Sequence, residues 1–258
     1  MIRNIVLLLL TSLLFSCMTQ GKVEHAQLIA HAGGSIDGNI YTNSMEAMHK
    51  AARDGYEFIE FDLMFTSDSV LVAAHSWSEF NTMTGYGHKG DSAPDFKEFI
   101  SRRIYNRYTP LSAADINEFF SERPDLYLVT DKVSDSEILS SYFPELKERM
   151  VVEAFSYKDY CRLVEDGYFR VMYSCMASDL DDTLMKNLLF DKLFPGKRVE
   201  WITLHTSGFE SRMFIFLNTV RKFNIALFTV DDYKEIPEKY KNRASMIYTN
   251  GIMPDKGK

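Results

Sequence analysis

Short apolar runs alternate with helix-like stretches along most of this chain, from about residue 27 onward. The runs are rich in β-branched and aromatic residues, as buried strands are. They cover residues 27–31, 57–65, 126–132, 150–155, 169–175, 200–206, 225–232 and 246–252. Helical patterns lie between most of them, and a regular alternation of this kind is typical of parallel sheets. The eight runs therefore predict an α/β fold, a (β/α)8 TIM barrel, within a single domain at residues 27–258.

The stretch 43–55 predicts the first helix together with its ends. Asn43 is the expected N-cap, Glu46 follows three residues later as in a capping box, and Gly55 is the expected C-terminal stop. Further helices are expected at 112–122, 136–149, 157–167, 179–194, 211–224 and 232–242.

Two features depart from simple alternation. The apolar run 70–75 follows the turn-rich residues 66–69 too soon for a helix to intervene, so we expect an extra strand that forms a hairpin with the run 57–65. The link 76–111 is the longest in the chain and carries several glycines and arginines. A connection of that length in a compact barrel is usually functional.

The first residues have the pattern of an export signal. Arg3 precedes the apolar stretch 5–15, which is shorter than the roughly 20 apolar residues that a spanning helix needs. The sequence LFSC at 14–17 resembles a bacterial lipobox, which predicts a signal at 1–17 and a lipidated Cys17. Residues 18–26 would then be a tether, and the protein an exported, membrane-anchored lipoprotein on the periplasmic or cell-surface side. An ordinary secretory signal is the alternative.

Charge and cysteine content narrow the possible partners. The formal net charge is −7, and the sequence has no basic block, so nucleic acid is not an expected partner. Cys161 and Cys175 could pair in an exported protein, but nothing in the sequence brings them together, and two buried free thiols are the expectation.

Two carboxylates interrupt the most apolar run. Glu60 and Asp62 stand two residues apart, so they point to the same face of the predicted strand. Side by side on an inward face they would repel each other unless a cation lies between them, and oxygen ligands suit Mg²⁺ or Ca²⁺. A solvent-facing strip on an edge strand is the alternative. His31 and His75 end the neighbouring runs, where the reactive groups of a parallel barrel gather.

The stretch 30–77 resembles the signature of the glycerophosphodiester phosphodiesterase family. That signature is His-Arg-Gly, an Asn-Thr helix start, a Gly before Glu-x-Asp, then Thr-x-Asp and Val-x-x-His. Weaker similarities follow in the same order and cover nearly all of the chain after the tether; they lie at 81–87, 109–120, 126–132, 228–232 and 247–252. Phospholipases C that act on inositol lipids are similar to the same barrels.

The resemblance implies a phosphodiester substrate, one divalent cation, and two histidines as general acid and base. By position, His31 and His75 take the proton roles, and Glu60 and Asp62 are metal ligands. Histidine suits proton transfer near neutral pH because its ordinary pKa is close to neutrality. Lys132 matches the lysine of the family's Glu-x-Lys strand and is a predicted substrate-binding residue.

Three positions depart from the family pattern. Ala32 replaces the arginine of His-Arg-Gly, so Lys132 or an arginine of the long link, such as Arg107, would have to bind the phosphate. Ser76 stands where the family usually has aspartate after the second histidine. Thr130 occupies the position of the third metal ligand and is a poor one.

Two residues compete for the place of this third ligand. Asp131 would reach the metal if its strand broke alternation there, and Glu153 on the next strand is the alternative. Glu153 and His205, which end later runs, are further candidates for substrate binding.

The sequence thus predicts a metal-dependent phosphodiester hydrolase that acts on glycerophosphodiesters or related phosphodiesters. Two alternatives remain: a lyase-type phospholipase C that acts on an intact lipid, and a degenerate barrel that binds phosphorylated glycan or lipid without catalysis.

Overall fold

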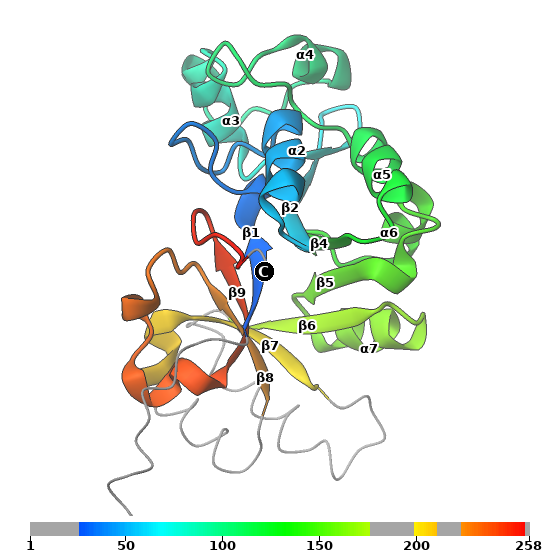
Figure 1. Ribbon diagram of the computed structural model, residues 1–258. Helices are drawn as coiled ribbons and strands as arrows, with labels where there is room; N and C mark the ends of the chain where they lie inside the picture. The colour runs from blue at the N-terminus through cyan, green and yellow to red at the C-terminus, as the bar shows by residue number, and fades with distance from the viewer. Residues whose placement is uncertain (1–25, 176–198, 211–222, 256–258) are drawn as a thin grey trace, which may run out of the picture.

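Eight parallel strands close into a barrel in the computed structural model, which describes residues 26–175, 199–210 and 223–255 (Figure 1). The sheet order is β1-β9-β8-β7-β6-β5-β4-β2-β3, and pairing of β1 with β2 closes the ring. The strands are β1 (Gln27–Ala30), β2 (Phe58–Phe65), β3 (Leu71–Ala73), β4 (Tyr127–Asp131), β5 (Met150–Ala154), β6 (Arg170–Cys175), β7 (Trp201–His205), β8 (Asn224–Phe228) and β9 (Ala244–Thr249). The predicted (β/α)8 TIM barrel is confirmed.

Helices cover the outside of the barrel. The α-helices of the described residues are α2 (Met45–Asp54), α3 (Trp77–Met83), α4 (Phe96–Ser101), α5 (Ala113–Glu122), α6 (Ser136–Tyr142) and α7 (Tyr157–Glu165). The 3-10 turns are η1 (His31–Gly33), η2 (Gly87–Lys89), η3 (Lys147–Arg149), η4 (Thr206–Glu210), η5 (Tyr233–Glu235) and η6 (Glu238–Arg243). The region 232–242, predicted as a helix, therefore forms 3-10 turns. The helix predicted at 179–194 and residues 211–222 of the helix predicted at 211–224, like the signal and most of the tether, lie outside the described residues. The last predicted residue, Asn224, begins β8.

Side chains alternate between two apolar layers because successive residues of a strand point to opposite faces. The inner layer fills the barrel and comes from nearly every strand: Ile29, Phe58, Val129, Val151, Met172, Ala226, Met246 and Tyr248 are all buried. The outer layer packs against the helices and includes Leu128, Val152 and Ile247 of the strands, with Leu163 of α7 in the same cluster. Toward the carboxyl ends of the strands the inward face carries Glu60, Asp62 and Asp131, and there the site is built.

The start of α2 differs from the prediction. Ser44, and not Asn43, is the N-cap: its hydroxyl accepts a hydrogen bond from the backbone N–H of Ala47. The Glu46 carboxylate reaches out of the helix to the backbone N–H and the hydroxyl of Thr109. The predicted capping box is therefore wrong, because long-range partners compete successfully for both side chains. Gly55 ends the helix as predicted, with a left-handed φ of 96°.

The hairpin and the long link are both present. β3 pairs antiparallel with β2, with Leu63 opposite Ala73. The link 76–111 carries α3, η2 and α4, which lie together beyond α2 in Figure 1. We call residues 76–111 the insertion. A separate apolar cluster, which includes Trp77, Phe80 and Phe99, packs it together.

Arg102 lies at the centre of the insertion with only 1% of its side chain exposed. Its guanidinium donates hydrogen bonds to Asn81 Oδ1 and to Glu98 Oε1, each at 2.6 Å, and its carbon Cζ lies 4.0 Å from the centre of the Tyr86 ring. A buried guanidinium with these partners, although its Nε has none among the described residues, links α3 and α4 of this loop-rich segment. The insertion is thus an ordered addition to the barrel.

The two cysteines of the described residues do not pair. Cys175 is buried and Cys161 is partly buried, and neither forms a disulfide within the described residues. Within the described residues, no helix is both long and apolar enough to cross a membrane.

Candidate active site

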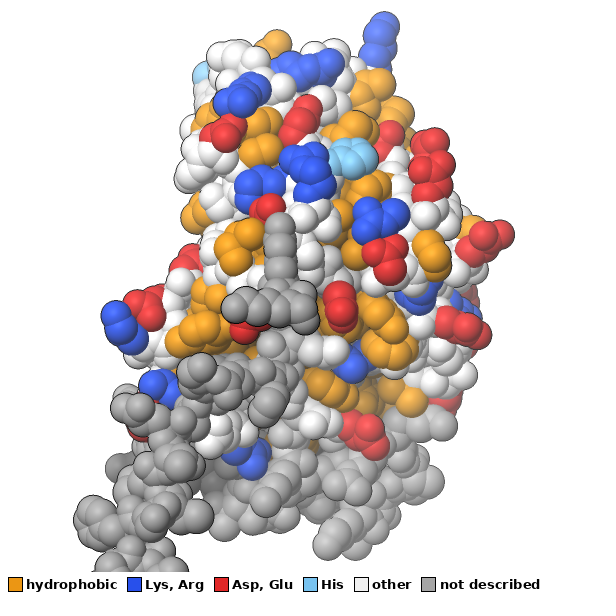
Figure 2. Space-filling model, viewed as in Figure 1, with side chains coloured by type: hydrophobic (Ala, Val, Ile, Leu, Met, Phe, Trp, Pro, Cys, Tyr) orange, Lys and Arg blue, Asp and Glu red, His pale blue; other side chains and the backbone are white. Residues whose placement is uncertain are grey.

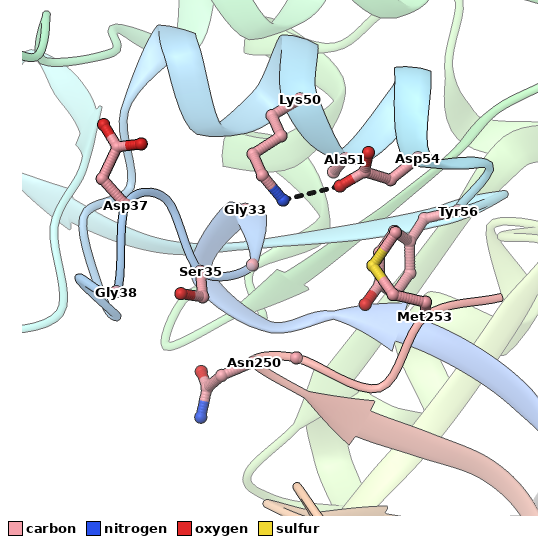
Figure 3. A pocket seen from close by; sticks show the side chains of 12 residues that line it. Gly33, Ser35, Asp37, Gly38, Lys50, Ala51, Asp54, Tyr56, Asn250 and Met253 are labelled. Carbon is pink, nitrogen blue, oxygen red and sulfur yellow. Dashed lines mark hydrogen bonds and ion pairs between the residues drawn. The ribbon is translucent and has the colours of Figure 1, made fainter.

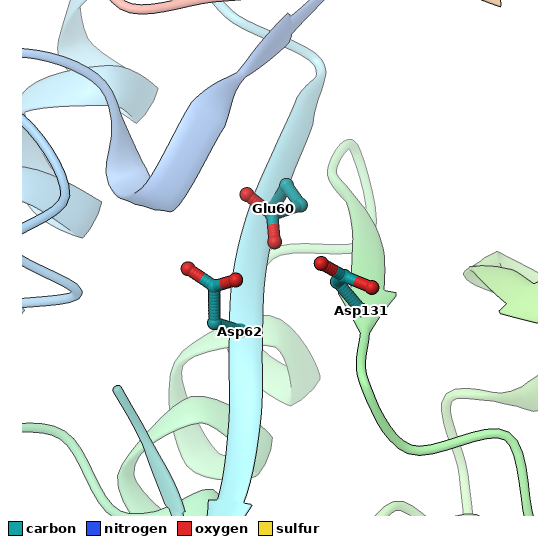
Figure 4. Close-up of side chains that lie close together, drawn as sticks. All are labelled: Glu60, Asp62 and Asp131. Carbon is teal, nitrogen blue, oxygen red and sulfur yellow. The ribbon is translucent and has the colours of Figure 1, made fainter. Parts of the chain in front are cut away.

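Three carboxylates meet at the carboxyl ends of neighbouring strands. Glu60 and Asp62 come from β2, and Asp131 comes from the end of β4 (Figure 4). Each offers one oxygen atom to a common group in which all the ligand atoms lie within 4.8 Å of one another. We call Glu60, Asp62 and Asp131 the acidic cluster.

Electrostatics within the acidic cluster are unfavourable without a cation. Burial raises the pKa of Glu60 well above its usual range, and the charges of Asp62 and Asp131 raise it further. Burial, followed by the charge of Asp62, also raises the pKa of Asp131. The Oε1 atom of Glu60 is buried and has no hydrogen-bond partner among the described residues. An orphaned acceptor beside two further carboxylates fits a hard divalent cation, which would supply the missing partner.

Neighbouring loops hold two of the three acids in place. The backbone N–H of Ala32 donates to Glu60 Oε2 at 2.7 Å. The Asn43 side-chain amide makes two hydrogen bonds to Asp62. Its Nδ2 donates to Asp62 Oδ2 at 3.0 Å, and its Oδ1 accepts from the Asp62 backbone N–H at 3.1 Å. Both contacts use left-handed backbone, with φ 49° at Ala32 and 45° at Asn43. Such outer partners fix the orientation of metal ligands.

Gly33 lets the loop after β1 approach α2 closely enough to make these contacts. Its φ is 82°, and a Cβ added there would lie 3.0 Å from the Ala47 Cβ. A side chain at this position would therefore be strained and would push the loop away from the acidic cluster.

Asp131 joins the acidic cluster without any break in the alternation of β4. Asp131 pairs in register with Asp62, and Val129 pairs with Glu60, so both β4 residues share the inward face. Thr130 pairs with Phe61 and lies on the outward face. The expectation that Asp131 reaches the cluster only if alternation fails was wrong, because the family motif alone does not reveal which face of this strand is inward.

Lys132 is the basic side chain of the described chain that meets the acidic cluster. Its Nζ lies 3.3 Å from Asp62 Oδ1 and 3.9 Å from Asp131 Oδ2, and about a third of the side chain is exposed. Burial acts to lower the pKa of Lys132, but the charges of these two acids outweigh it and raise the pKa. The backbone φ of 68° turns the chain at the strand end, where Lys132 follows Asp131.

The insertion arginines Arg102 and Arg107 contact groups other than the acidic cluster. Arg107 Nη1 pairs with Asp37 Oδ2 at 2.6 Å, and Arg102 is buried in the insertion. Of the cations considered as substitutes for the arginine missing at Ala32, Lys132 therefore has the position to meet a phosphate.

His31 follows β1 and is held by distant parts of the chain. Its Nδ1 lies 3.2 Å from the hydroxyl of Thr229, and its ring packs edge-on against Tyr248. Burial lowers the pKa of His31; the charge of Asp62 opposes this shift, and His75 adds to it. The net effect favours the neutral imidazole, which can accept a proton.

His75 lies just beyond β3 and is held locally. Its Nδ1 lies 2.5 Å from Glu79 Oε2, one turn along α3. Ser76 is the N-cap of this helix, and its hydroxyl accepts from the Glu79 backbone N–H. A hydrogen bond at Nδ1 fixes the ring and leaves Nε2 to exchange a proton with a ligand.

Tyr41 lies between the two histidines. Its ring centre is 4.7 Å from that of His31 and also 4.7 Å from that of His75. Burial raises the pKa of Tyr41, while its contact with the Thr229 hydroxyl acts in the opposite direction. The φ of Tyr41 is 57°, a conformation that sequence patterns do not reveal for a non-glycine residue. Sequence analysis missed Tyr41, Thr229 and Glu79; for Glu79 the i, i+4 spacing from His75 was an available signal.

Glu153 lies on the inward face of β5 but outside the acidic cluster. Its Oε1 accepts a hydrogen bond from the Tyr248 hydroxyl at 2.6 Å, and its Oε2 accepts from Thr203 Oγ1 at 3.2 Å. Burial, together with the charge of Asp131, raises the pKa of Glu153 to about 8. The structure thus brings Asp131 rather than Glu153 into the acidic cluster. Substrate binding by Glu153 stays a prediction, made less attractive by the hydrogen-bond partners that its oxygens already have.

His205 ends β7 with an exposed ring. Its Nδ1 lies 2.8 Å from Ser207 Oγ, and the ring packs against Phe228. No described contact joins it to the acidic cluster, so its role in substrate binding stays a prediction.

A separate pocket of about 260 Å³ adjoins the loop after β1 (Figure 3). Gly33, Ser35 and Asn250 line one part of it, and Lys50 and Asp54 of α2 line another. Lys50 Nζ is paired with Asp54 Oδ2 at 2.6 Å, and none of the lining residues belongs to the acidic cluster.

On the face seen in Figure 2, basic and acidic side chains are interspersed rather than gathered by sign. The acidic cluster with its flanking histidines remains the best candidate site.

Comparison with known families gives a match over the part of the chain that carries this site. The model of the Glycerophosphoryl diester phosphodiesterase family matches residues 31–160, which is half of the chain and includes the acidic cluster and both flanking histidines. The chain belongs to the glycerophosphoryl diester phosphodiesterase family. Mouse glycerophosphodiester phosphodiesterase 1 is 24% identical over 160 residues, which are 49% of this chain and 46% of the mouse protein. The chain thus spans about half the length of that curated relative.

Solved structures of the family share the fold. A glycerophosphodiester phosphodiesterase from Parabacteroides distasonis is 20% identical with a TM-score of 0.64, covering 89% of this chain and 94% of that one. A phosphodiesterase from Oleispira antarctica, solved with the product sn-glycerol-3-phosphate, is 17% identical with a TM-score of 0.61, covering 88% and 93%. At these identities the similarity establishes the barrel, and the chemistry must be argued from the side chains.

Proposed function

We propose that this protein is a metal-dependent phosphodiesterase that hydrolyses glycerophosphodiesters, with His31 and His75 as the proton-transferring residues. One observation carries the proposal: the acidic cluster, with an orphaned Glu60 oxygen, lies in a family barrel whose two strand-end histidines both contact Tyr41. A cation held by these carboxylates, with two imidazoles nearby, would form a site suited to a phosphate ester.

Glu60, Asp62 and Asp131 would hold the cation, either Mg²⁺ or Ca²⁺. When bound, it supplies positive charge that offsets the charge of the phosphodiester and of its transition state. Lys132 supports the same role, because its Nζ lies between the acids and solvent and can meet a phosphate oxygen. Lys132 thereby takes over the charge that the arginine missing at Ala32 would bring.

The proton steps fall to the histidines. His31, whose lowered pKa favours the neutral ring, accepts the proton of the attacking hydroxyl. His75, protonated on both nitrogens, donates its Nε2 proton to the leaving alkoxide and keeps the Nδ1 proton that is hydrogen-bonded to Glu79. If the neighbouring hydroxyl of the glycerol attacks first, a cyclic phosphate forms; the histidines then exchange roles as water opens the ring.

Hydrolysis of glycerophosphocholine by the pure protein tests the proposal, with Mg²⁺ or Ca²⁺ added and choline release measured. We expect turnover that is abolished by a chelator and restored by the cation. The Asp131→Asn variant should lose turnover. The control Glu122→Gln, at an exposed residue that ends α5, should keep it. Absence of turnover on every glycerophosphodiester offered, in protein shown to be folded, would reject the proposal.

The alternatives make different predictions in the same assay. A lyase acting on an intact lipid would leave a cyclic phosphate as its final product, and a degenerate barrel would bind a phosphodiester without turnover. Retention of both His31 and His75 beside the acidic cluster favours the hydrolase.

We also propose that the protein is exported and anchored through a lipidated Cys17. The lipobox-like residues 14–17 support this proposal. Labelling of cells with a clickable fatty acid should tag the wild type and leave Cys17→Ala untagged; equal labelling of both would rule out this anchor.

A further inference from the structure

The second histidine has a carboxylate partner that the family pattern does not place there. The residue after His75 is Ser76, where the family usually carries aspartate. The carboxylate of Glu79 instead lies 2.5 Å from His75 Nδ1, in the i, i+4 relation along the start of α3. Ser76 instead caps α3, because its hydroxyl accepts a hydrogen bond from the Glu79 backbone N–H at 3.2 Å.

We propose that Glu79 is the positioning residue of His75, and that it supplies from the first turn of α3 the carboxylate that is missing at position 76. This inference rests on the proposed function, because it assigns Glu79 a role in the proton transfer by His75. Glu79 does not contact the acidic cluster in any described interaction, so it acts on the reaction through the imidazole.

Three features support the assignment. First, the geometry is specific: the carboxylate meets Nδ1, which selects the tautomer with the proton on Nδ1 and directs Nε2 away from Glu79. Second, the ring also packs against Tyr41, with ring centres 4.7 Å apart, so the imidazole has two partners. Third, about a third of the His75 side chain is exposed, so packing alone does not fix its rotamer.

The helix that presents Glu79 is itself anchored. Trp77 and Phe80 of α3 are buried in the apolar cluster of the insertion, and the rings of Phe80 and Phe99 stack at 4.6 Å. The Glu79 backbone is therefore placed by the insertion core. The insertion thus contributes a positioning group to the site, which gives this long connection a function.

A carboxylate swap between positions 76 and 79 tests the proposal. Glu79→Ala should lower kcat by up to about 100-fold with little change in KM, because a loosely held imidazole is misplaced for proton transfer. The double variant Ser76→Asp/Glu79→Ala should recover most of this loss, since aspartate restores a carboxylate beside His75. Aspartate is also as good an N-cap as serine, so the swap keeps α3 intact.

A matched control is available on α2. Lys50 and Asp54 form another i, i+4 ion pair, at 2.6 Å and partly exposed, that involves no imidazole. Asp54→Asn should leave kcat near the wild-type value. A wild-type rate in Glu79→Ala would overturn the proposal. A loss in Glu79→Ala that Ser76→Asp does not restore would overturn the idea that the two positions exchange one carboxylate.

A second measurement does not depend on turnover. Long-range ¹H–¹⁵N NMR of the histidine rings should show His75 protonated on Nδ1 in the wild type and a mixture of tautomers in Glu79→Ala. A locked tautomer in a protein without activity would reject the proposed function and retain the pairing. An unlocked ring in an active wild type would reject the pairing and retain the proposed function.

Discussion

The two halves of the candidate site are built in different ways. The His31 half belongs to the barrel: His31 is covered by Tyr248 from β9 and lies beside Thr229, which is 198 residues away in the sequence. The His75 half belongs to the insertion: the partner of His75 is Glu79, only four residues away, and both side chains are partly exposed. Only Tyr41 contacts both imidazoles in the described chain.

The two halves of the site depend on different parts of the structure for their stability. A residue fixed by strand pairing shares the stability of the whole sheet, whereas a residue fixed by a short helix shares only the stability of the segment that carries it. We therefore expect perturbations of the barrel groups that support the acidic cluster to affect cation binding or global stability. Perturbations of the insertion should affect proton transfer and local stability without loss of cation affinity.

Removing either imidazole should have the largest effect. His31→Ala and His75→Ala should each lower kcat by about 10²–10⁴-fold, the usual contribution of general acid–base catalysis. Cation affinity, measured by calorimetry, should be retained in both. His88→Ala, at an exposed site of η2, serves as the control. If only one of the two variants lost activity, the two-histidine mechanism would be wrong.

Glu153 should make the stability of the barrel half depend on pH. Its pKa is about 8 in the folded protein against an ordinary value of 4.5, so between these values the folded protein keeps a proton that the unfolded chain has released. The free energy of unfolding should therefore fall as pH rises through this window, by up to about 1.4 kcal/mol per pH unit from this group.

Denaturant titrations between pH 5 and pH 8 check the effect of Glu153. Glu153→Gln should flatten the profile and gain stability relative to the wild type as pH rises. Glu118→Gln, at an exposed position on α5, should follow the wild-type profile. Parallel profiles for the wild type and Glu153→Gln would refute the assignment of a raised pKa to Glu153.

Loosening the support of one acid should weaken cation binding. Asn43→Gly removes both hydrogen bonds to Asp62 while glycine tolerates the left-handed φ of 45°. We expect a cation affinity lower by roughly 10–100-fold, the usual cost of losing an outer partner of a metal ligand. Asn39→Ala in the same loop, whose amide donates to the Ile36 carbonyl and makes no described contact with the acidic cluster, is the control. Equal calorimetric affinities for the two variants would contradict this role of Asn43.

Loosening the insertion should have the smallest and most local effect. Arg102→Met leaves Asn81 Oδ1 without its guanidinium partner and should cost about 1–3 kcal/mol of local stability. Hydrogen exchange should rise in α3 and α4 and remain slow in the barrel strands, and kcat should fall without loss of cation affinity. Arg103→Met, exposed on the next residue, should change neither. Exchange that rose equally across the barrel would show that the two halves are not separate units of stability.

Much of this site could be predicted from the sequence because it lies on regular elements. Period-two alternation placed Glu60 and Asp62 on one inward face, and the order of His31, these two acids and His75 matched a family pattern. The helix start at Asn43 was misjudged, because a favourable local cap competes there with a long-range hydrogen bond to Asp62.

The remaining site residues depend on tertiary contacts. Tyr41 is brought between the histidines by left-handed backbone in the loop after β1, and Thr229 meets His31 only when the barrel closes. Asp131 was uncertain because a motif does not reveal which face of β4 is inward; the register with Asp62 decides it.

The sequence by itself determined the barrel, the insertion and the chemical character of the site, since strand periodicity and residue type are local properties. Only the tertiary structure decided that Asp131 completes the acidic cluster, that Lys132 lies beside it and that Thr229 meets His31. Those choices depend on which side chains converge once eight strands share one ring, and convergence of distant residues is a property of the closed sheet rather than of any single segment.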